Sequence, residues 1–182
     1  MTQFKSILFF IGILYLFYLL SILLPLSSYG ILPREPLGLL GIVTAPFLHG
    51  SLWHLISNTA PLAILLTILY RFYPDQAMLV IFFTTITGGL LVWLFARSAI
   101  HIGASGLVYG LAGFLISNGF INFKPLTLAI SLGVLFAYGG LIWGVLPSVR
   151  TYISWESHLF GALSGVLIAY LLKRRPVFKN AS

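Results

Sequence analysis

The sequence predicts an all-α polytopic membrane protein built as a single domain over residues 1–182. Of its 182 residues, 59% are hydrophobic and 7% are charged, and the mean hydropathy is +1.05. A soluble domain with polar loops does not reach this balance. The apolar residues also form continuous runs, unlike the short alternating segments of a membrane barrel. Six runs are long enough to cross a bilayer as helices: 7–26, 52–70, 77–95, 102–121, 126–145 and 157–172.

The first run, residues 7–26, has no charge and follows Lys5, so we expect a retained membrane span. A cleaved signal peptide is the alternative. The run is longer than a usual signal core and lacks a clear Ala-x-Ala site, which favours retention. The connection from Ser27 to Ser51 is irregular but rich in leucine. Because these leucines would be costly to leave in water, we expect this loop to rest on the membrane interface.

The second run, residues 52–70, carries two polar side chains on one helical face. His54 and Asn58 lie four residues apart, one turn from each other. Pro61 follows them and is expected to bend the helix or free a carbonyl there. The third run, residues 77–95, has no such pair.

The fourth run, residues 102–121, places a hydroxyl close to its start. Ser105 stands between two glycines in Gly103-Ala104-Ser105-Gly106. This is where a nucleophile at modest membrane depth would lie. Further along the run, Gly110 and Gly113 continue the face that Gly106 begins.

The fifth run, residues 126–145, contains three glycines, Gly133, Gly139 and Gly140, before its last turn. The sixth run, residues 157–172, has His158 as its second residue. Below His158, Gly161 and Gly165 form a small-xxx-small face of the kind that lets two membrane helices approach closely. The glycines of the fourth and sixth runs therefore predict that these two helices pack together.

Cationic residues predict the orientation. With a cytoplasmic N-terminus, seven cations lie inside and three outside. The inner set is Lys5, Arg71, Lys124, Lys173, Arg174, Arg175 and Lys179, and the outer set is Arg34, Arg97 and Arg150. Both termini are therefore predicted to be cytoplasmic. The second, fourth and sixth spans then begin at the outer face, so His54, Ser105 and His158 share one level within about two helical turns of the surface.

The net charge of +7 does not predict a nucleic-acid partner. The basic residues lie in short loops and in the tail instead of along a folded face, so a bilayer accounts for them better. The sequence carries no signal for an oligomeric state.

The residues at this shared level could carry acyl transfer. A serine hydroxyl needs a base, and a neutral histidine is suited to that role, so Ser105 and His158 form a candidate pair. Glu156 is two residues from His158 and does not share its helical face, which favours a dyad over a triad. His54, Asn58 and the backbone N–H of Ser105 are candidate donors to an oxyanion. The alternative is that these groups only pack and bond to one another.

Mechanisms that use a cysteine nucleophile, a pair of aspartates or a zinc-binding motif lack the residues that they require. The chain has no cysteine, a single aspartate and no His-Glu-x-x-His motif. His49 and His101 fall in outer loops and, with His54 and His158, offer four imidazoles, but their spacing matches no metal-ligand pattern. We therefore expect neither a metal nor another cofactor.

These motifs together resemble those of the rhomboid intramembrane serine proteases. Gly103-Ala104-Ser105-Gly106 resembles the G-x-S-G motif of that family, and His54-Leu-Ile-Ser-Asn58 resembles its H-x-x-x-N motif. Ser157-His158-Leu-Phe-Gly161-Ala-Leu-Ser-Gly165 is similar to the sixth span of the family. The resemblance covers the six-span core, and it joins motifs on three separate helices in the right order.

The resemblance implies hydrolysis of a peptide bond in or near a transmembrane segment of another membrane protein. Ser105 would attack the carbonyl, His158 would act as the base, and His54 and Asn58 would hold the oxyanion. Tyr109 matches the tyrosine that packs against the catalytic histidine in the family, and Gly103, Gly106, Gly161 and Gly165 would support the site. Residues 126–155 map loosely to the substrate gate. One departure is that the Trp-Arg pair common in the first loop of the family is absent between Ser27 and Ser51.

Two other functions compete with proteolysis. A non-catalytic rhomboid-like protein that binds membrane clients would generally lack the serine or the histidine, and both are present. A small transporter would carry polar residues across the bilayer, whereas here they gather at one level. The small size and the absence of an organelle-targeting segment favour a prokaryotic plasma membrane.

Overall fold

The structure is a computed structural model that describes residues 2–147 and 154–173 of the chain. These residues form helices joined by turns and short connections. The α-helices are α1 (Thr2–Ser21), α2 (Gly41–Thr44), α3 (Leu52–Phe72), α4 (Pro74–Phe95), α5 (Ser105–Asn122), α6 (Pro125–Tyr138) and α7 (Trp155–Leu172). The 3-10 segments are η1 (Leu26–Tyr29), η2 (Pro36–Leu39), η3 (Ala45–Phe47) and η4 (Gly139–Val145).

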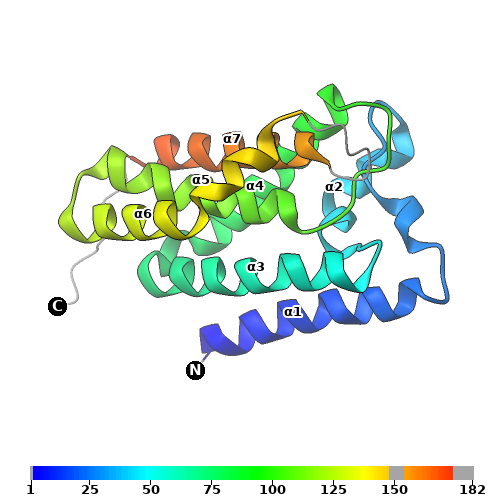
Figure 1. Cartoon of the computed structure of the whole chain (residues 1–182), viewed down its shortest axis with the longest axis horizontal. Coiled ribbons are helices and arrows are strands. Elements are labelled where there is room, and N and C mark those ends of the chain that lie inside the picture. The colour runs from blue at the N-terminus through cyan, green and yellow to red at the C-terminus, as the bar shows by residue number, and fades with distance from the viewer. Residues whose placement is uncertain (1, 148–153, 174–182) are drawn as a thin grey trace.

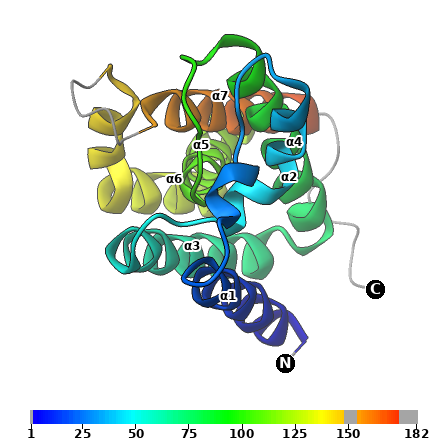
Figure 2. The same cartoon turned by 90° about the vertical axis from the view of Figure 1, so that its right-hand side faces the viewer.

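Helix α5 lies at the centre of the bundle. It packs against α7, α6, α4 and α3, while α1 lies outside and packs on α3 (Figure 1, Figure 2). Ten of the 18 residues of α5 are buried, among them Leu111, Phe114 and Leu115 with no exposed surface. The central part of α5 is therefore surrounded by the other helices, while Ser105 and Gly106 at its start are only partly buried.

Five segments within the described residues are long and apolar enough to cross a membrane, which agrees with a multi-pass membrane protein. They are Gln3–Ser21, Leu52–Phe72, Pro74–Phe95, Pro125–Val145 and Trp155–Leu172. These segments correspond to five of the six predicted runs. The remaining run, the fourth at 102–121, became α5, which contains two asparagines, Asn118 and Asn122. Because protein surrounds α5, its sides can be less apolar than those of helices that face lipid.

Two predicted boundaries were wrong, and a third predicted span changes its helix type within its predicted bounds. The first run, 7–26, forms a helix at Thr2–Ser21 instead. After Ser21 the chain tightens into i to i−3 bonds, as from Ile22 N to Leu19 O, and Pro25 lacks an N–H for a helical bond.

The other two differences occur at glycines. Helix α5 begins at Ser105 and not at Ile102, because Gly103 has a φ of +115° that a helix does not allow. The fifth run is α-helical only to Tyr138 and continues as the 3-10 segment η4, which opens with two glycines of low helix propensity. Helices α3, α4 and α7 begin and end within three residues of the prediction.

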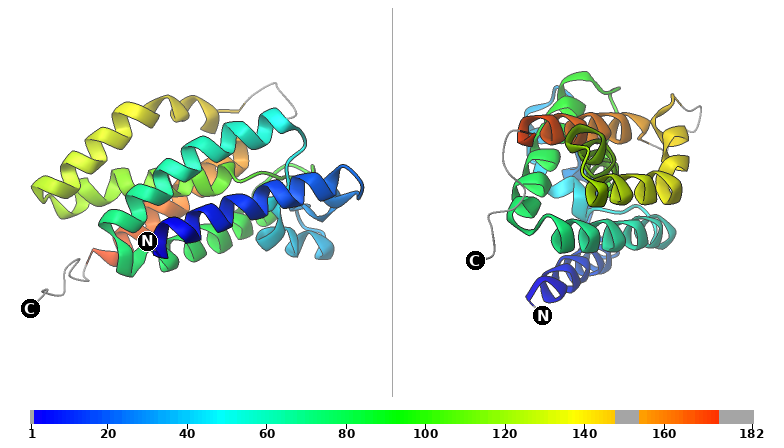
Figure 3. Two further views of the ribbon diagram at one scale, coloured as in Figure 1. Left: turned by 90° about the horizontal axis from the view of Figure 1, so that it is seen from below. Right: turned by 90° about the vertical axis from the view of Figure 1, so that its left-hand side faces the viewer.

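Helices α3, α5 and α7 begin at one end of the bundle, whereas α1 begins and α7 ends at the other (Figure 1, Figure 3). The starts of the three helices that carry His54, Ser105 and His158 therefore lie at one level, as the sequence indicated. Four cations used to predict the orientation, Arg150, Arg174, Arg175 and Lys179, lie outside the described residues.

The first loop folds over the end of α4. It consists of η1, η2, α2 and η3, and α2 packs on α4. The Arg34 guanidinium donates to Ala96 O at 2.8 Å and to Ser98 Oγ at 2.9 Å, and Trp93 Nε1 donates to Glu35 O at 2.9 Å. An arginine of the loop and a tryptophan of α4 thus fasten the loop, although the loop itself has no Trp-Arg pair. The other side of the loop is an exposed apolar edge formed by Leu37, Leu39, Leu40 and Val43.

Candidate active site

A tight turn delivers Ser105 to the start of α5. Gly103 adopts a φ of +115°, and its N–H donates to Ala45 O at 2.9 Å. A Cβ at this position would lie 2.6 Å from His54 Nε2, so a side chain here meets both backbone strain and the histidine ring. Glycine is therefore required before Ala104 and Ser105, and the turn holds the first residue of α5 against α3.

Ser105 and His158 lie in hydrogen-bond contact. His158 Nε2 is 2.9 Å from Ser105 Oγ, and His158 Nδ1 is 2.9 Å from the carbonyl oxygen of Gly144. Since a carbonyl oxygen only accepts, Nδ1 carries the proton and donates to Gly144. The neutral ring then has its lone pair on Nε2, where it accepts from the serine hydroxyl. This is the tautomer that a general base needs.

The Tyr109 ring stacks on the ring of His158. The two ring centroids are 4.2 Å apart and the planes differ by 3°. Tyr109 lies four residues after Ser105, so it projects from the same face of α5. The imidazole is thus held by a stacked ring on its face, by Gly144 O at one nitrogen and by Ser105 at the other.

Glycines bring α5 and α7 close enough for this contact. A Cβ at Gly161 would overlap the carbonyl of Gly106, and a Cβ at Gly165 would overlap the carbonyl of Gly110. These two pairs are one helical turn apart on each helix, so the backbones touch along a continuous strip. The pairing agrees with the small-xxx-small face that the sequence predicted.

Two of the three candidate oxyanion donors, His54 and Asn58, lie on α3, and the third lies on α5. Asn58 is 5% exposed, and its Nδ2 donates to the backbone carbonyl of His54 at 2.7 Å, which leaves the second N–H of the amide for another acceptor. The backbone N–H of Ser105 belongs to the first turn of α5, whose amide groups have no partner within the helix.

The candidate dyad, its stacking partner and the α3 donors line one cavity of about 730 Å³. Its walls include Ser105, His158, Tyr109, His54 and Asn58. A cavity of this size accommodates several residues of an extended peptide or one ligand of drug size. The candidate nucleophile, the candidate base and the candidate oxyanion donors His54 and Asn58 therefore face a common space.

His49 contributes a contact that the sequence did not indicate. Its ring centroid is 5.0 Å from that of His54, and its Nε2 is 3.5 Å from Ala104 N, the residue before the serine. Burial, with a smaller contribution from His54, lowers the pKa of His49 from 6.5 to about 4. The ring is therefore neutral at physiological pH and can accept from Ala104.

The four histidines do not gather into one cluster. The His101 ring bonds to Ser154, four residues before His158, rather than to the dyad residues themselves. Within the described residues, no three histidine or carboxylate side chains come close enough together to hold a metal ion.

Comparison with known proteins gives the family. A model described as the Rhomboid domain matches residues 36–175, which include every residue of the candidate site. The chain belongs to the rhomboid family. RHOMBOID-like protein 4 of Arabidopsis thaliana is 32% identical over 139 residues, which cover 74% of this chain and 34% of the plant protein.

Bacterial relatives cover more of this rhomboid chain. An uncharacterized protein of Mycobacterium tuberculosis is 39% identical over 182 residues, which cover 92% of this chain and 74% of the relative. A second one, from Mycobacterium leprae, is also 39% identical and covers 92% of this chain and 70% of the relative.

Within this rhomboid domain, sequence reasoning missed two contacts at the candidate site. The Gly144 carbonyl lies in η4, and a backbone acceptor leaves no trace in a sequence. His49 lies five residues before His54. This spacing was the signal in the sequence for a contact between the two histidines. Because His49 lies in a loop, the spacing does not determine the orientation of its ring.

Proposed function

We propose that this rhomboid-family protein is an intramembrane serine protease that cleaves peptide bonds in or near transmembrane segments of other membrane proteins. The observation that carries the proposal is the 2.9 Å contact between Ser105 Oγ and His158 Nε2, with Nδ1 of the same ring bonded to Gly144 O. The contact gives the serine a base in the right tautomer, beside a cavity that also contains oxyanion donors.

The first half of the reaction forms an acyl-enzyme. Ser105 Oγ attacks the carbonyl carbon of the scissile peptide bond, and His158 Nε2 takes the hydroxyl proton. The carbonyl oxygen becomes an oxyanion held by His54, Asn58 and the backbone N–H of Ser105. The C–N bond then breaks, His158 returns the proton to the leaving amine, and an ester to Ser105 remains.

The second half regenerates the enzyme. Water attacks the ester carbonyl while His158 Nε2 takes one of its protons. The tetrahedral intermediate collapses, the proton returns from His158 to Ser105 Oγ, and a carboxylic acid product is released, which then loses its proton to water. The cavity beside the dyad supplies space for this water once the amine product has left.

The membrane arrangement follows from the same proposal. Helix α5 is a sixth span, enclosed by α3, α4, α6 and α7, and it carries the nucleophile in its own first turn, within about two helical turns of the outer surface. Both termini are cytoplasmic, which places α7 with its His158 end outward. The bacterial relatives support a plasma membrane as the location. Substrates are transmembrane proteins that reach the cavity from the surrounding bilayer.

A cleavage assay tests the proposal. The purified protein is reconstituted with a reporter that has one transmembrane segment, and the wild type is compared with Ser105→Ala and His158→Ala. Ser117→Ala is the matched control, since it removes a serine from α5 about three turns away. We expect cleavage by the wild type and the control, and none above background in the two dyad variants. Cleavage that survives Ser105→Ala would contradict the proposal, and a stably bound but uncut reporter would favour a non-catalytic binding role.

A further inference from the structure

A second side-chain contact joins the connection before α5 to the start of α7. These are the two segments that the contact between Ser105 and His158 also joins. The second contact involves His101, which lies in the connection between α4 and α5 and is 2% exposed. The backbone of His101 pairs with that of Ile31 in the first loop, through bonds of 2.9 and 3.0 Å in the two directions. The ring is therefore carried on a fixed backbone and enclosed by protein.

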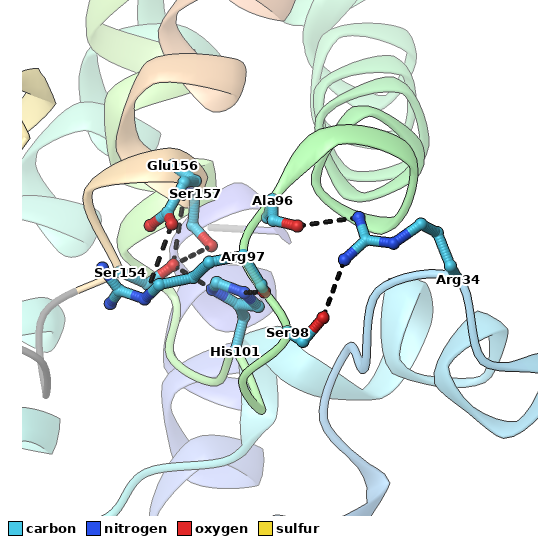
Figure 4. A network of polar contacts seen from close by, with 8 residues as sticks. All are labelled: Arg34, Ala96, Arg97, Ser98, His101, Ser154, Glu156 and Ser157. Atoms are coloured by element: carbon cyan, nitrogen blue, oxygen red, sulfur yellow. Dashed lines mark hydrogen bonds and ion pairs between the residues drawn. The ribbon is translucent and has the colours of Figure 1, made fainter.

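The hydrogen bonds of the His101 ring have a defined direction. Nε2 is 3.1 Å from Arg97 O, and because a carbonyl only accepts, Nε2 carries the proton. Burial lowers the pKa of His101 below its ordinary value, so the ring is neutral near pH 7. Nδ1 is then an acceptor, and its partner is the hydroxyl of Ser154. Figure 4 shows the ring between Arg97 and Ser154.

Ser154 is the N-cap of α7. Its Oγ accepts from Ser157 N at 3.3 Å and lies 2.6 Å from Ser157 Oγ. Since the Ser154 proton goes to His101, the Ser157 hydroxyl donates to Ser154. The same turns are joined by an ion pair, with Arg97 Nε 3.5 Å from Glu156 Oε1, and Glu156 is 3% exposed. The start of α7 is thus bonded to the turn that precedes α5 (Figure 4).

The contact between His101 and Ser154 and the dyad contact share one register. His101 lies four residues before Ser105, and Ser154 lies four residues before His158. Both pairs are separated by 53 positions in the chain. The contact between His101 and Ser154 therefore joins the same two segments as the contact between Ser105 and His158. It lies four residues earlier in each segment, toward the end of the bundle where α5 and α7 begin.

We propose that His101 is a positioning residue that sets the separation of Ser105 and His158 by bonding the turn before α5 to the N-cap of α7. The inference rests on the proposed protease function, because it assigns His101 a role in that reaction. His101 touches neither dyad atom and acts through Ser154. Its loss leaves α5 and α7 packed through their glycines but frees the first turn of α7, which carries the base.

Two substitutions at His101 each keep one of the two hydrogen bonds of the ring and remove the other. In His101→Asn the amide oxygen takes roughly the place of Nδ1 and still accepts from Ser154. In His101→Gln the longer amide takes the place of Nε2 and bonds to Arg97 O, but loses Ser154. We expect His101→Asn to keep kcat within about threefold of the wild type and His101→Gln to lower it about 10- to 100-fold with little change in KM, since small misplacements of reacting groups have effects of that size.

Ser98→Ala is the matched control. It removes a side-chain bond to Arg34 from the same connection and does not touch Ser154. A purely structural role for His101 would lower the melting temperature in both His101 variants and leave kcat per folded molecule unchanged. His101 also lines the cavity, and a contact with substrate there would raise KM instead. Either result would overturn the inference.

A double-mutant cycle completes the test. If His101 acts through Ser154, the double variant His101→Gln with Ser154→Ala loses no more kcat than Ser154→Ala alone. If the kcat losses of the two single variants multiply in the double variant, the inference is overturned. Wild-type kcat in His101→Gln, alongside inactive Ser105→Ala, would refute only the role of His101. A wild type without Ser105-dependent cleavage would refute the proposed function itself, and this inference with it.

Discussion

The close approach of α5 and α7 makes Gly161→Ala a sensitive test of how the dyad is assembled. A Cβ at Gly161 would overlap the carbonyl oxygen of Gly106 and lie 2.9 Å from its carbonyl carbon, whereas ordinary contact begins near 3.4 Å. Relief of this overlap requires the helices to move apart locally by about 1 Å.

The dyad lies within reach of that displacement. His158 is three residues before Gly161, about 4.5 Å along the helix axis. Ser105 Oγ and His158 Nε2 are 2.9 Å apart, so a shift of about 1 Å takes them to nearly 4 Å, beyond hydrogen-bond range. We expect kcat of Gly161→Ala to fall about 100-fold. The overpacking also lowers stability, by about 1–3 kcal/mol.

The assay compares kcat per folded molecule for Gly161→Ala, Gly113→Ala and Gly12→Ala. Gly113 provides a milder and more distant overlap, with its Cβ 2.7 Å from Ala162 O, so kcat should fall less than in Gly161→Ala. Gly12 lies on α1, where a Cβ would meet nothing within 4 Å, and its variant should match the wild type. A folded Gly161→Ala enzyme with wild-type kcat would refute the claim that this contact sets the dyad geometry.

Further predictions concern the groups around the dyad. His54→Ala and Asn58→Ala should each lower kcat about 10- to 1,000-fold, as the loss of an oxyanion donor does, without preventing a serine-directed probe from labelling Ser105; lost labelling in folded protein would contradict this role. Tyr109→Phe should keep most activity because the stacked ring remains, whereas Tyr109→Leu should lower kcat about 2- to 10-fold; equal kcat in the two variants would argue against stacking. Because the pKa of His49 is lowered from 6.5 to about 4, the unfolded chain binds more protons than the folded one between these values, so stability falls as the pH drops through that range. His49→Gln should flatten this fall in melting temperature, and an unchanged pH profile would contradict the assignment.

Much of this bundle could be predicted from apolar runs and from glycine and histidine positions. Spans were predictable because the bilayer demands long apolar helices. The convergence of Ser105 with His158 was predictable because alternate helices begin at one face and because glycines mark where backbones touch. Because the span that carries His54 and Asn58 begins at the same face, these two residues could also be placed at the level of the dyad.

Long-range contacts in the connections were not predictable. The Gly144 carbonyl that fixes the tautomer of His158 depends on where α6 changes to a 3-10 segment. His101 was set apart only as a loop histidine, because its partner Ser154 lies 53 residues away and no periodicity links them. The burial of α5 was likewise hidden, since apolarity alone does not separate a helix facing lipid from one facing protein.

Covalent labelling of the nucleophile tests the central claim most directly. Purified protein in detergent or bilayers is treated with a fluorophosphonate, which reacts with activated serines, and the modified residue is located by peptide mass spectrometry. We predict a single adduct on Ser105 in the wild type and in Ser117→Ala, and none in folded His158→Ala. An adduct on another serine, or equal labelling of Ser105 without His158, would contradict a Ser105–His158 dyad.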